Sequence, residues 1–522
     1  MHWLAAERWH WFRTVDIQTN IAGCGFEWFC APLILLTKSD RILFLPNLLQ
    51  FLLLPGMIFS VFRRLGVRPR VAWWWMWILP SGWCFIMQAG STVNDAIAAV
   101  YVLASVDFAL RARERKNVGD LWLAMLAAAL ATGVKQTDIP LALLAVIAIW
   151  PAMPLLFQRP LASLTVIAAS VLVSALPMIL LDLHYTGSWV GVPASGGHPI
   201  ILPSPFWGVV GNIFCLTIQN LKPPVFPIVN SWNTAMRHFL ETPFGAHFTG
   251  FEDFGRLTFG VAETTAGLGA GICLLIIISF WAARCQRRTS GATGVTRGTE
   301  GQLRLLRWTP WLLLLLFMAK VGAFGNARYL APYYFFFFPS LLIGPGHSAL
   351  VRRRWWQSCA LLVMISAVIL LVISRDRPVF PAQTVIGWLQ AKYPDTKLVV
   401  SVSRTYAETP AFEDQRSVLR TILPPDAPVL GYAAVDGVIE SCLWLPYGQR
   451  QVQRILPGDP SEQTRQAGIH YVVLENNLLI QTHQTLQQWL ARYHGMVTKQ
   501  WEFLANPYEP PERFYLVHLQ YP

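Results

Sequence analysis

Long apolar stretches alternate with short, mostly basic polar stretches over the first 374 residues of the chain. About 20 helical residues cross the hydrocarbon layer of a bilayer, and ten stretches are candidates for such helices. Two of them, 121–134 and 308–322, are short and need their flanking residues. The pattern predicts a multi-pass α-helical membrane bundle of about ten spans. The ten segments are 42–62, 71–89, 94–110, 121–134, 139–157, 161–182, 264–283, 308–322, 328–346 and 356–374.

The connections between these segments differ in charge. Alternate connections, beginning with the one after segment 42–62, are rich in Arg and Lys, whereas the short loops on the other side hold only Lys135, Lys320 and Arg328. The positive-inside rule assigns basic loops to the cytoplasm. We therefore expect 1–41, the long loop 183–263 and the C-terminal region to lie outside the cytoplasm.

Composition supports this division and removes one alternative. Charged residues make up 13% of the chain, against about 25% in soluble domains, and apolar residues make up 54%. The formal net charge of +12 could suggest a nucleic-acid partner, but the basic excess lies in the predicted cytoplasmic loops. The charge is thus a topology signal, and we expect the lipid bilayer and no nucleic acid as a partner.

Three regions follow from these patterns. Residues 1–41 form an external segment with interfacial helices, 42–374 form the transmembrane bundle including the external loop 183–263, and 375–522 form an extracytoplasmic domain of ordinary charge density. In the last region, buried strands are expected at 429–432 and 471–474, with closing strands at 501–504 and 514–517. Three helical patterns accompany them, at 436–445, 460–467 and 482–493. The alternation favours a C-terminal soluble α/β domain with a mainly parallel sheet.

The N-terminus conflicts with the expected topology. Residues 1–41 are predicted to be external, yet residues 1–23 lack the apolar core of a signal sequence. Either the N-terminus crosses the membrane unaided, or the sequence begins at an internal Met, which is the interpretation we favour.

Four short motifs appear in order along the bundle. They are GFEW at Gly25–Trp28, QAGSTVND at Gln88–Asp95, ATGVKQT at Ala131–Thr137 and GNARYLAP at Gly325–Pro332. Together with their sidedness, they resemble the bacterial GT-C membrane glycosyltransferases. Within these enzymes, the resemblance is to the broad group of the dolichyl-phosphate-mannose–protein mannosyltransferases (glycosyltransferase family 39-like) and the lipid A aminoarabinose transferases.

The resemblance implies an enzyme of the bacterial inner membrane. It would transfer a sugar from a polyprenyl-phosphate donor to an acceptor on the extracytoplasmic side, with inversion. A carboxylate in the first external loop would act as general base, and basic side chains would hold the leaving phosphate. The family's first helix, and the catalytic acid directly after it, precede the stretch that Met1 begins here. The catalytic residue is thus unknown, with Asp16 as a weak substitute.

Three charged residues in the motifs are candidate substrate ligands. Asp95 faces the donor cavity or caps its helix, and both roles are compatible. Lys135 binds phosphate, or it snorkels or pairs with Asp138. Arg328 binds phosphate through its planar guanidinium, or anchors the helix beside an aromatic belt.

Two external carboxylates, Glu27 and Glu263, lie close to membrane entry points and are further candidates for lining the site. Lys320 is a weaker one. No spacing typical of a metal site is present, so no metal or other cofactor is expected, and a divalent metal has no support in the sequence.

Two alternatives to the enzyme remain open. The same basic residues would serve a lipid-linked glycan carrier or flippase, and the missing acid would suit a truncated, inactive relative that only binds. The sequence names neither the sugar nor the acceptor, which is a lipid, a glycan or a protein.

Overall fold

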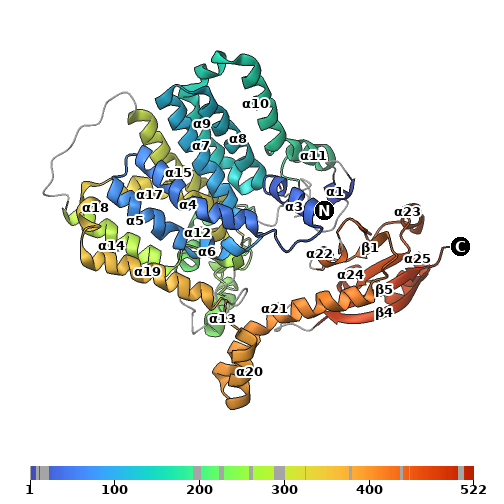
Figure 1. The fold of residues 1–522 in the computed structure, drawn as a ribbon. Coiled ribbons are helices and arrows are strands. Elements are labelled where there is room, and N and C mark those ends of the chain that lie inside the picture. The colour runs from blue at the N-terminus through green and yellow to red at the C-terminus, as the bar shows by residue number, and fades with distance from the viewer. Residues whose placement is uncertain are drawn as a thin grey trace.

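The computed structural model shows a mostly helical bundle followed by a small C-terminal sheet domain (Figure 1). It describes residues 2–6, 11, 23–191, 201–222, 229–257, 263–286, 300–323, 325–374, 379–435, 439–445, 447–503 and 511–521. Asp16 lies outside these residues.

Within this described part, three helical stretches are long and apolar enough to cross a membrane: Leu45–Arg64 (α4), Gln136–Gln158 and Arg354–Val372 (α19). Two bent pairs would raise the number to five if each is one span. Pro160–Val173 (α10) and Leu176–Thr186 (α11) meet at 47°, and Trp83–Gly90 meets Asp95–Arg115 (α7) at 110°. Among the described residues, three to five helical stretches could thus span a membrane, which is fewer than the ten spans predicted.

Helix-breaking residues account for much of the difference. Segment 71–89 divides around Pro80 and Gly82 into short helices, and segment 328–346 divides into three. Proline removes a backbone donor and ends helices that hydropathy alone reads as continuous. The short pieces are α5 (Pro69–Ile78), η1 (Leu79–Ser81), α6 (Trp83–Ile86), η2 (Met87–Gly90), α16 (Asn326–Tyr329), α17 (Ala331–Leu342) and α18 (Pro345–Leu350).

Other segments form helices that are short or carry charges. Segment 121–134 becomes α8 (Val118–Val134) and segment 264–283 becomes α14 (Ala270–Gln286), both 17 residues long. Segment 308–322 lies in α15 (Glu300–Lys320), which includes charged residues at both ends. The stretch Gln136–Gln158 comprises η3 (Gln136–Leu141), α9 (Ala142–Ile149) and η4 (Trp150–Gln158).

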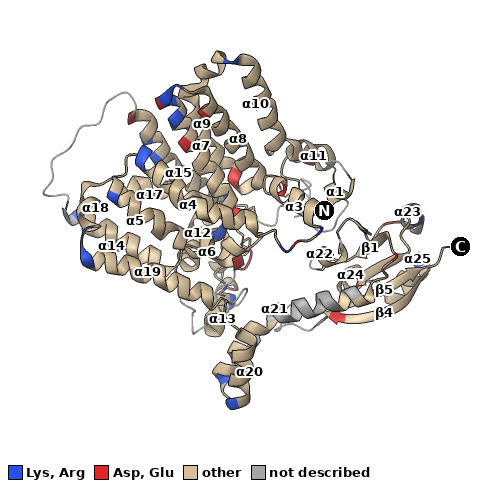
Figure 2. Ribbon diagram, in the orientation of Figure 1, with Lys and Arg blue, Asp and Glu red and all other residues tan. Residues whose placement is uncertain are grey.

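Helix ends that the positive-inside rule places in the cytoplasm lie together at one end of the bundle. Arg64 of α4 pairs with Asp107 of α7 at 2.7 Å, and Arg307 of α15 donates to the carbonyl of Leu65 at 2.8 Å. Figure 2 shows basic residues gathered at the edge of the bundle formed by these ends, away from the C-terminal sheet. The charge asymmetry read from the loops is thus also a spatial asymmetry.

The predicted external loop 183–263 contains two helices, α12 (Pro205–Asn220) and α13 (Val229–Leu240). Helix α12 packs on α15, and the buried Asn212 amide donates to the carbonyls of Met318 and Val321 at 2.8 and 2.7 Å. Aromatic rings from both helices and from the turn Gly245–Phe248 (η5) form a separate small core. This loop is therefore folded over the bundle.

The C-terminal domain follows two helices, α20 (Ala382–Lys392) and α21 (Lys397–Ile422), which lead away from the bundle to the sheet (Figure 1). The five strands have the order β2-β1-β3-β5-β4. Their bounds are β1 (Val429–Ala433), β2 (Gln451–Arg454), β3 (Tyr471–Glu475), β4 (Gly495–Phe503) and β5 (Glu512–Leu519). Four short helices join them: α22 (Glu440–Leu443), α23 (Ser461–Gln466), α24 (Asn476–Gln481) and α25 (Leu486–Tyr493).

The α/β character of this domain agrees with the prediction, but the sheet is mixed. Strand β1 pairs in parallel with β2 and β3, whereas β5 pairs antiparallel with β3 and β4. Strand β2 was missed because Gln451–Arg454 is polar apart from Val452, as suits an edge strand.

Candidate functional site

Three of the five predicted substrate ligands meet in one buried cluster, although they come from three helices. Asp95 is the first residue of α7, Lys135 follows the last residue of α8, and Arg328 lies in the short helix α16. The Lys135 Nζ lies 2.5 Å from Asp95 Oδ1, and the Arg328 Nε lies 3.4 Å from Asp95 Oδ2. The Asp95 side chain is only 2% exposed. We call Asp95, Lys135 and Arg328 the charge cluster.

The carboxylate of Asp95 is committed to this cluster. Its Oδ2 also accepts from Gln88 Nε2 at 3.0 Å, and Gln88 Oε1 accepts from the backbone N–H of Ala96 at 2.8 Å. No side-chain cap is formed at Asn94, which precedes α7. The position in the first helical turn still favours a negative charge, so the helix end and the two cations stabilise the same carboxylate.

The sharp bend before α7 is built from specific hydrogen bonds. Asn47, fully buried in α4, donates from Nδ2 to the carbonyls of Ser91 at 2.8 Å and Val93 at 2.6 Å. The Ser91 hydroxyl in turn accepts from the Val93 N–H at 2.8 Å. These contacts hold the stretch between Gln88 and Asp95 in place, so both side chains reach the cluster from a bent backbone.

Lys135 is positioned by close packing at the end of α8. The Gly25 N–H donates to the Gly133 carbonyl at 2.8 Å. A Cβ atom at Gly25 would lie 2.7 Å from the Leu130 carbonyl oxygen, closer than real Cβ contacts. Glycine at this position therefore allows the N-terminal segment to lie against α8 immediately before Lys135.

The short helix α16, which carries Arg328, is held by polar side chains of α12. Gln219 Oε1 accepts from the Ala327 N–H at 2.8 Å, and Asn212 Oδ1 accepts from Asn326 Nδ2 at 2.5 Å. The ring of Tyr329 lies 5.3 Å from Lys135 Nζ and 5.0 Å from the Arg328 guanidinium carbon. Such cation–π contacts favour two cations at short range. Helix α12 of the loop 183–263 thus helps to place Arg328.

The cluster has a surplus of cationic groups around one carboxylate. Two cations share Asp95, and the Arg328 Nε forms no hydrogen bond to any described residue. Asp138 is close to the cluster and 2% exposed, and its Oδ2 likewise has no hydrogen-bond partner in the described part of the chain. Because an isolated buried carboxylate is costly to ionise, Asp138 is a weak counter-charge. The arrangement can therefore accept an anion such as phosphate.

Glu27 lies on the same side of α8 as the charge cluster. It begins α3 (Glu27–Thr37), an eleven-residue helix too short to cross a bilayer. Burial raises the pKa of the Glu27 carboxyl to about 7, an effect that the nearby charge of Lys135 partly offsets. Its Oε2 has no hydrogen-bond partner among the described residues. A buried carboxyl that titrates near neutral pH suits a general base.

The remaining predicted residues are dispersed. Glu263 is buried in the turn η6 (Glu263–Thr265), which packs beside α16, but outside the cluster's contacts. Lys320 is exposed at the end of α15. Asp16, the weak catalytic candidate, falls outside the described residues. Among the residues that are described, no group of three or more His, Cys, Asp or Glu could hold a metal ion.

Sequence reasoning missed the residues that support the cluster. Gln88 begins the motif at 88–95, but only the 110° bend brings its side chain into contact with Asp95. Asn47 lies inside the apolar segment 42–62. An amide side chain within such a segment indicates a buried polar network and could have identified it. Asp182 of α11 was also missed; both its carboxylate oxygens are buried without a hydrogen-bond partner in the described structure.

Comparison with known proteins adds no family to this description. The chain matches no protein-family model, no curated protein and no solved structure.

Proposed function

We propose that this protein is a membrane glycosyltransferase that transfers a sugar from a polyprenyl-phosphate donor to an acceptor hydroxyl outside the cytoplasm. The observation that carries the proposal is the convergence of Lys135 and Arg328 on Asp95. This cluster comes from helix ends that the loop charges assign to the extracytoplasmic side. The motif resemblance to the GT-C enzymes of the bacterial inner membrane supports the same function.

In this mechanism Lys135 and Arg328 bind the phosphate of the donor. As the bond between the anomeric carbon and the phosphate oxygen breaks, negative charge grows on the leaving phosphate. Cations in a water-poor site stabilise that charge far more than they would in bulk water. Asp95 keeps the two cations together before the donor arrives, which lowers the cost of placing like charges side by side.

Glu27 is the proposed general base. The acceptor hydroxyl attacks the anomeric carbon from the face opposite the phosphate, and its proton passes to the Glu27 carboxylate. A carboxyl with a pKa of about 7 takes a proton effectively near neutral pH. This assignment gives Glu27 the general-base role that a carboxylate after the first helix has in the GT-C enzymes. Asp16 remains the competing candidate.

The experiment is sugar transfer from a polyprenyl-phosphate donor by the purified protein in lipid nanodiscs. Arg328→Ala and Lys135→Ala should each lower the rate by about 10²–10³-fold, the usual effect of removing one transition-state cation or donor. Lys320→Ala is the matched control, because Lys320 is external by the same topology but exposed, and it should keep the wild-type rate. Unchanged transfer in both cluster variants would overturn the phosphate assignment.

The same variants separate the enzyme from a carrier. If the wild-type protein binds the donor and moves it between leaflets without transferring sugar, a flippase is correct. If it binds the donor and does neither, the chain is a binding relative. Donor binding should weaken in both cluster variants under all three functions, so the transfer and flipping assays decide between them.

A further inference from the structure

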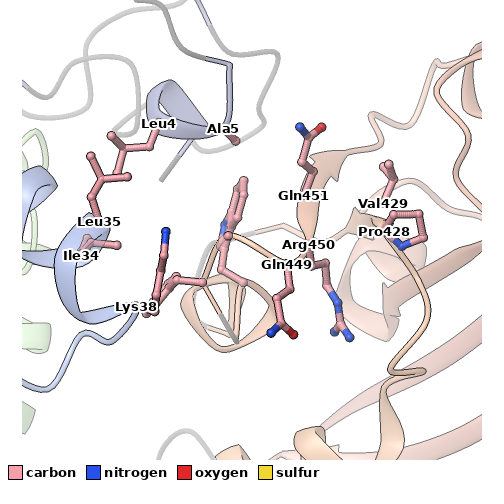
Figure 3. Close-up of a pocket in the computed structure, with 13 residues that line it drawn as sticks. Leu4, Ala5, Ile34, Leu35, Lys38, Pro428, Val429, Gln449, Arg450 and Gln451 are labelled. Atoms are coloured by element: carbon pink, nitrogen blue, oxygen red, sulfur yellow. The ribbon is translucent and has the colours of Figure 1, made fainter.

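A cavity of about 470 Å³ lies between the N-terminal helices and the C-terminal domain. None of the residues that line it belongs to the charge cluster. One wall comes from α1 (His2–Ala6) and α3. The other comes from strand β1 and from the segment between α22 and β2 (Figure 3). The cavity therefore exists only where the two parts of the protein meet.

The junction that forms this cavity is held by polar and apolar contacts. Glu440 of the C-terminal domain lies 2.6 Å from His2 Nε2, and it also accepts from Arg454 Nε at 2.9 Å. The Tyr447 hydroxyl donates to Asp40 Oδ2 at 3.2 Å. Ile34 of α3 belongs to the hydrophobic core of the C-terminal domain. The cavity thus lies in an organised interface.

The charged residues that line the cavity, Lys38 and Arg450, are both cations. Arg450 is 8% exposed, and it donates from Nη2 to the Pro424 carbonyl at 2.7 Å. Its Nη1 is buried with no hydrogen-bond partner in the described residues. A buried guanidinium with an unused donor is costly unless an anion completes it.

The rest of the lining is largely apolar and adjoins a surface suited to lipid. Leu4, Ile34, Leu35 and Trp444 line the cavity. On α3 the exposed residues include Trp28, Phe29, Leu35 and Leu36, the last 81% exposed. Exposed aromatic and aliphatic side chains grouped in this way form an apolar surface of the kind that contacts lipid or another apolar partner. The cavity therefore borders an exposed apolar surface on α3.

We propose that this cavity binds the headgroup of an anionic phospholipid, with the phosphate on Arg450 and Lys38 and apolar parts over Leu35 and Trp444. This site is separate from the charge cluster, and the proposal needs only that the protein lies in a membrane. It goes beyond sugar transfer by giving the junction between the N-terminal helices and the C-terminal domain a lipid partner. Bound lipid would join the two walls of the cavity.

The test is native mass spectrometry of the purified full chain in a neutral detergent, titrated with short-chain phosphatidylglycerol. Phosphatidylglycerol should bind at least about tenfold tighter than phosphatidylcholine, because only the former carries a net negative charge for the two cations. Lys38→Ala and Arg450→Met should each weaken this binding by about tenfold. Lys499→Ala, an exposed cation on β4, should leave it unchanged.

Each remaining outcome decides the proposal. Equal binding of the two lipids, or wild-type binding in Lys38→Ala, overturns it. If glycerol phosphate competes as well as the lipid does, the ligand is a small free anion and the proposal of a lipid ligand is wrong. If Arg450→Met does not fold, Lys38→Ala carries the test, since Lys38 is exposed. Arg328→Ala should bind the lipid normally, which distinguishes failure here from failure of the proposed transfer activity.

Discussion

The Lys135 ammonium lies 2.5 Å from the Asp95 carboxylate, although 40 residues separate the two positions in the chain. Lys135 directly follows α8 and Asp95 begins α7, so two neighbouring antiparallel helices bring opposite charges together at one end of the bundle. Arg328 then adds a second cation to the same carboxylate. An acid shared by two bases in a buried site has consequences for stability as well as for binding.

Asp95→Asn should destabilise the protein by about 1–3 kcal/mol, because it leaves two partly buried cations without their counter-charge. The measurement is the free energy of unfolding in mixed micelles by detergent titration. Adding Lys135→Met to Asp95→Asn should restore part of the loss, since one surplus cation is removed. Asp395→Asn, at an exposed position after α20, is the control, and an equally small effect at both positions would contradict the shared ion pair.

Glu27 should make sugar transfer depend on pH. Because its pKa is raised to about 7, the base is increasingly protonated below pH 7, and the rate should fall about tenfold per pH unit there. Glu27→Gln should lower the rate by about 10²–10⁴-fold and abolish this dependence. Glu241→Gln, at an exposed position, should change neither, and a pH profile that survives Glu27→Gln would assign the base elsewhere.

The same carboxyl has an effect on folding with a definite sign. Its folded pKa of about 7 exceeds the ordinary value of 4.5, so the folded state binds the extra proton between these values. The contribution of Glu27 to the free energy of unfolding is therefore largest below about pH 4.5 and declines as pH rises toward 7. Comparing wild-type and Glu27→Gln unfolding over this range should show the decline in the wild type only.

Gly25→Ala should destabilise the protein by about 1–3 kcal/mol, because the new methyl group would collide with the backbone of α8. Gly56→Ala in α4 is a matched control, since a Cβ there has nothing within 4 Å. It should be neutral or stabilising by up to about 1 kcal/mol, as alanine favours helix. Thermal unfolding of both variants checks this, and equal stability of the two would place Gly25 away from α8.

Glu440 should hold the C-terminal domain to the N-terminus in a pH-dependent manner. Burial would raise its pKa, but the His2 hydrogen bond and the charge of Arg454 outweigh burial and lower it. A lowered pKa means that the stabilising contribution is present at neutral pH and is lost as pH falls through the folded value.

Hydrogen exchange of residues 440–445 provides the measurement for this interface. Glu440→Gln should speed exchange there at neutral pH, whereas Glu462→Gln, in an exposed pair on α23, should not. Identical exchange in wild type and Glu440→Gln would show that the contact does not hold the interface.

Sequence patterns predicted the local features of this protein well. Apolar length indicated a helical membrane protein, and ordinary charge density after residue 374 indicated a separate α/β region. The motifs contain Asp95, Lys135 and Arg328, which the sequence predicts to be substrate ligands. Whether they bind phosphate remains a prediction. The helical content of the first 374 residues and the C-terminal α/β region agree with the prediction, because hydropathy and charge density are local properties of the sequence.

Contacts between residues that are far apart in the chain could be identified only from the tertiary structure. The hydropathy pattern predicted ten spans because it contains no information on backbone breaks. Segment 71–89 is broken around Pro80 and Gly82, and the helix axis turns by 110° before Asp95. The sheet became mixed because β5 pairs antiparallel with both neighbours.

By itself, then, the sequence determined which residues prefer lipid, which loops are basic, and which few charged residues depart from that pattern. Only the tertiary structure decided that Lys135 and Arg328 share the carboxylate of Asp95, and that a cavity lined by two cations forms where α3 meets the C-terminal domain. The physical reason is that burial and pairing energies depend on neighbours brought close by folding, and these neighbours are distant along the chain.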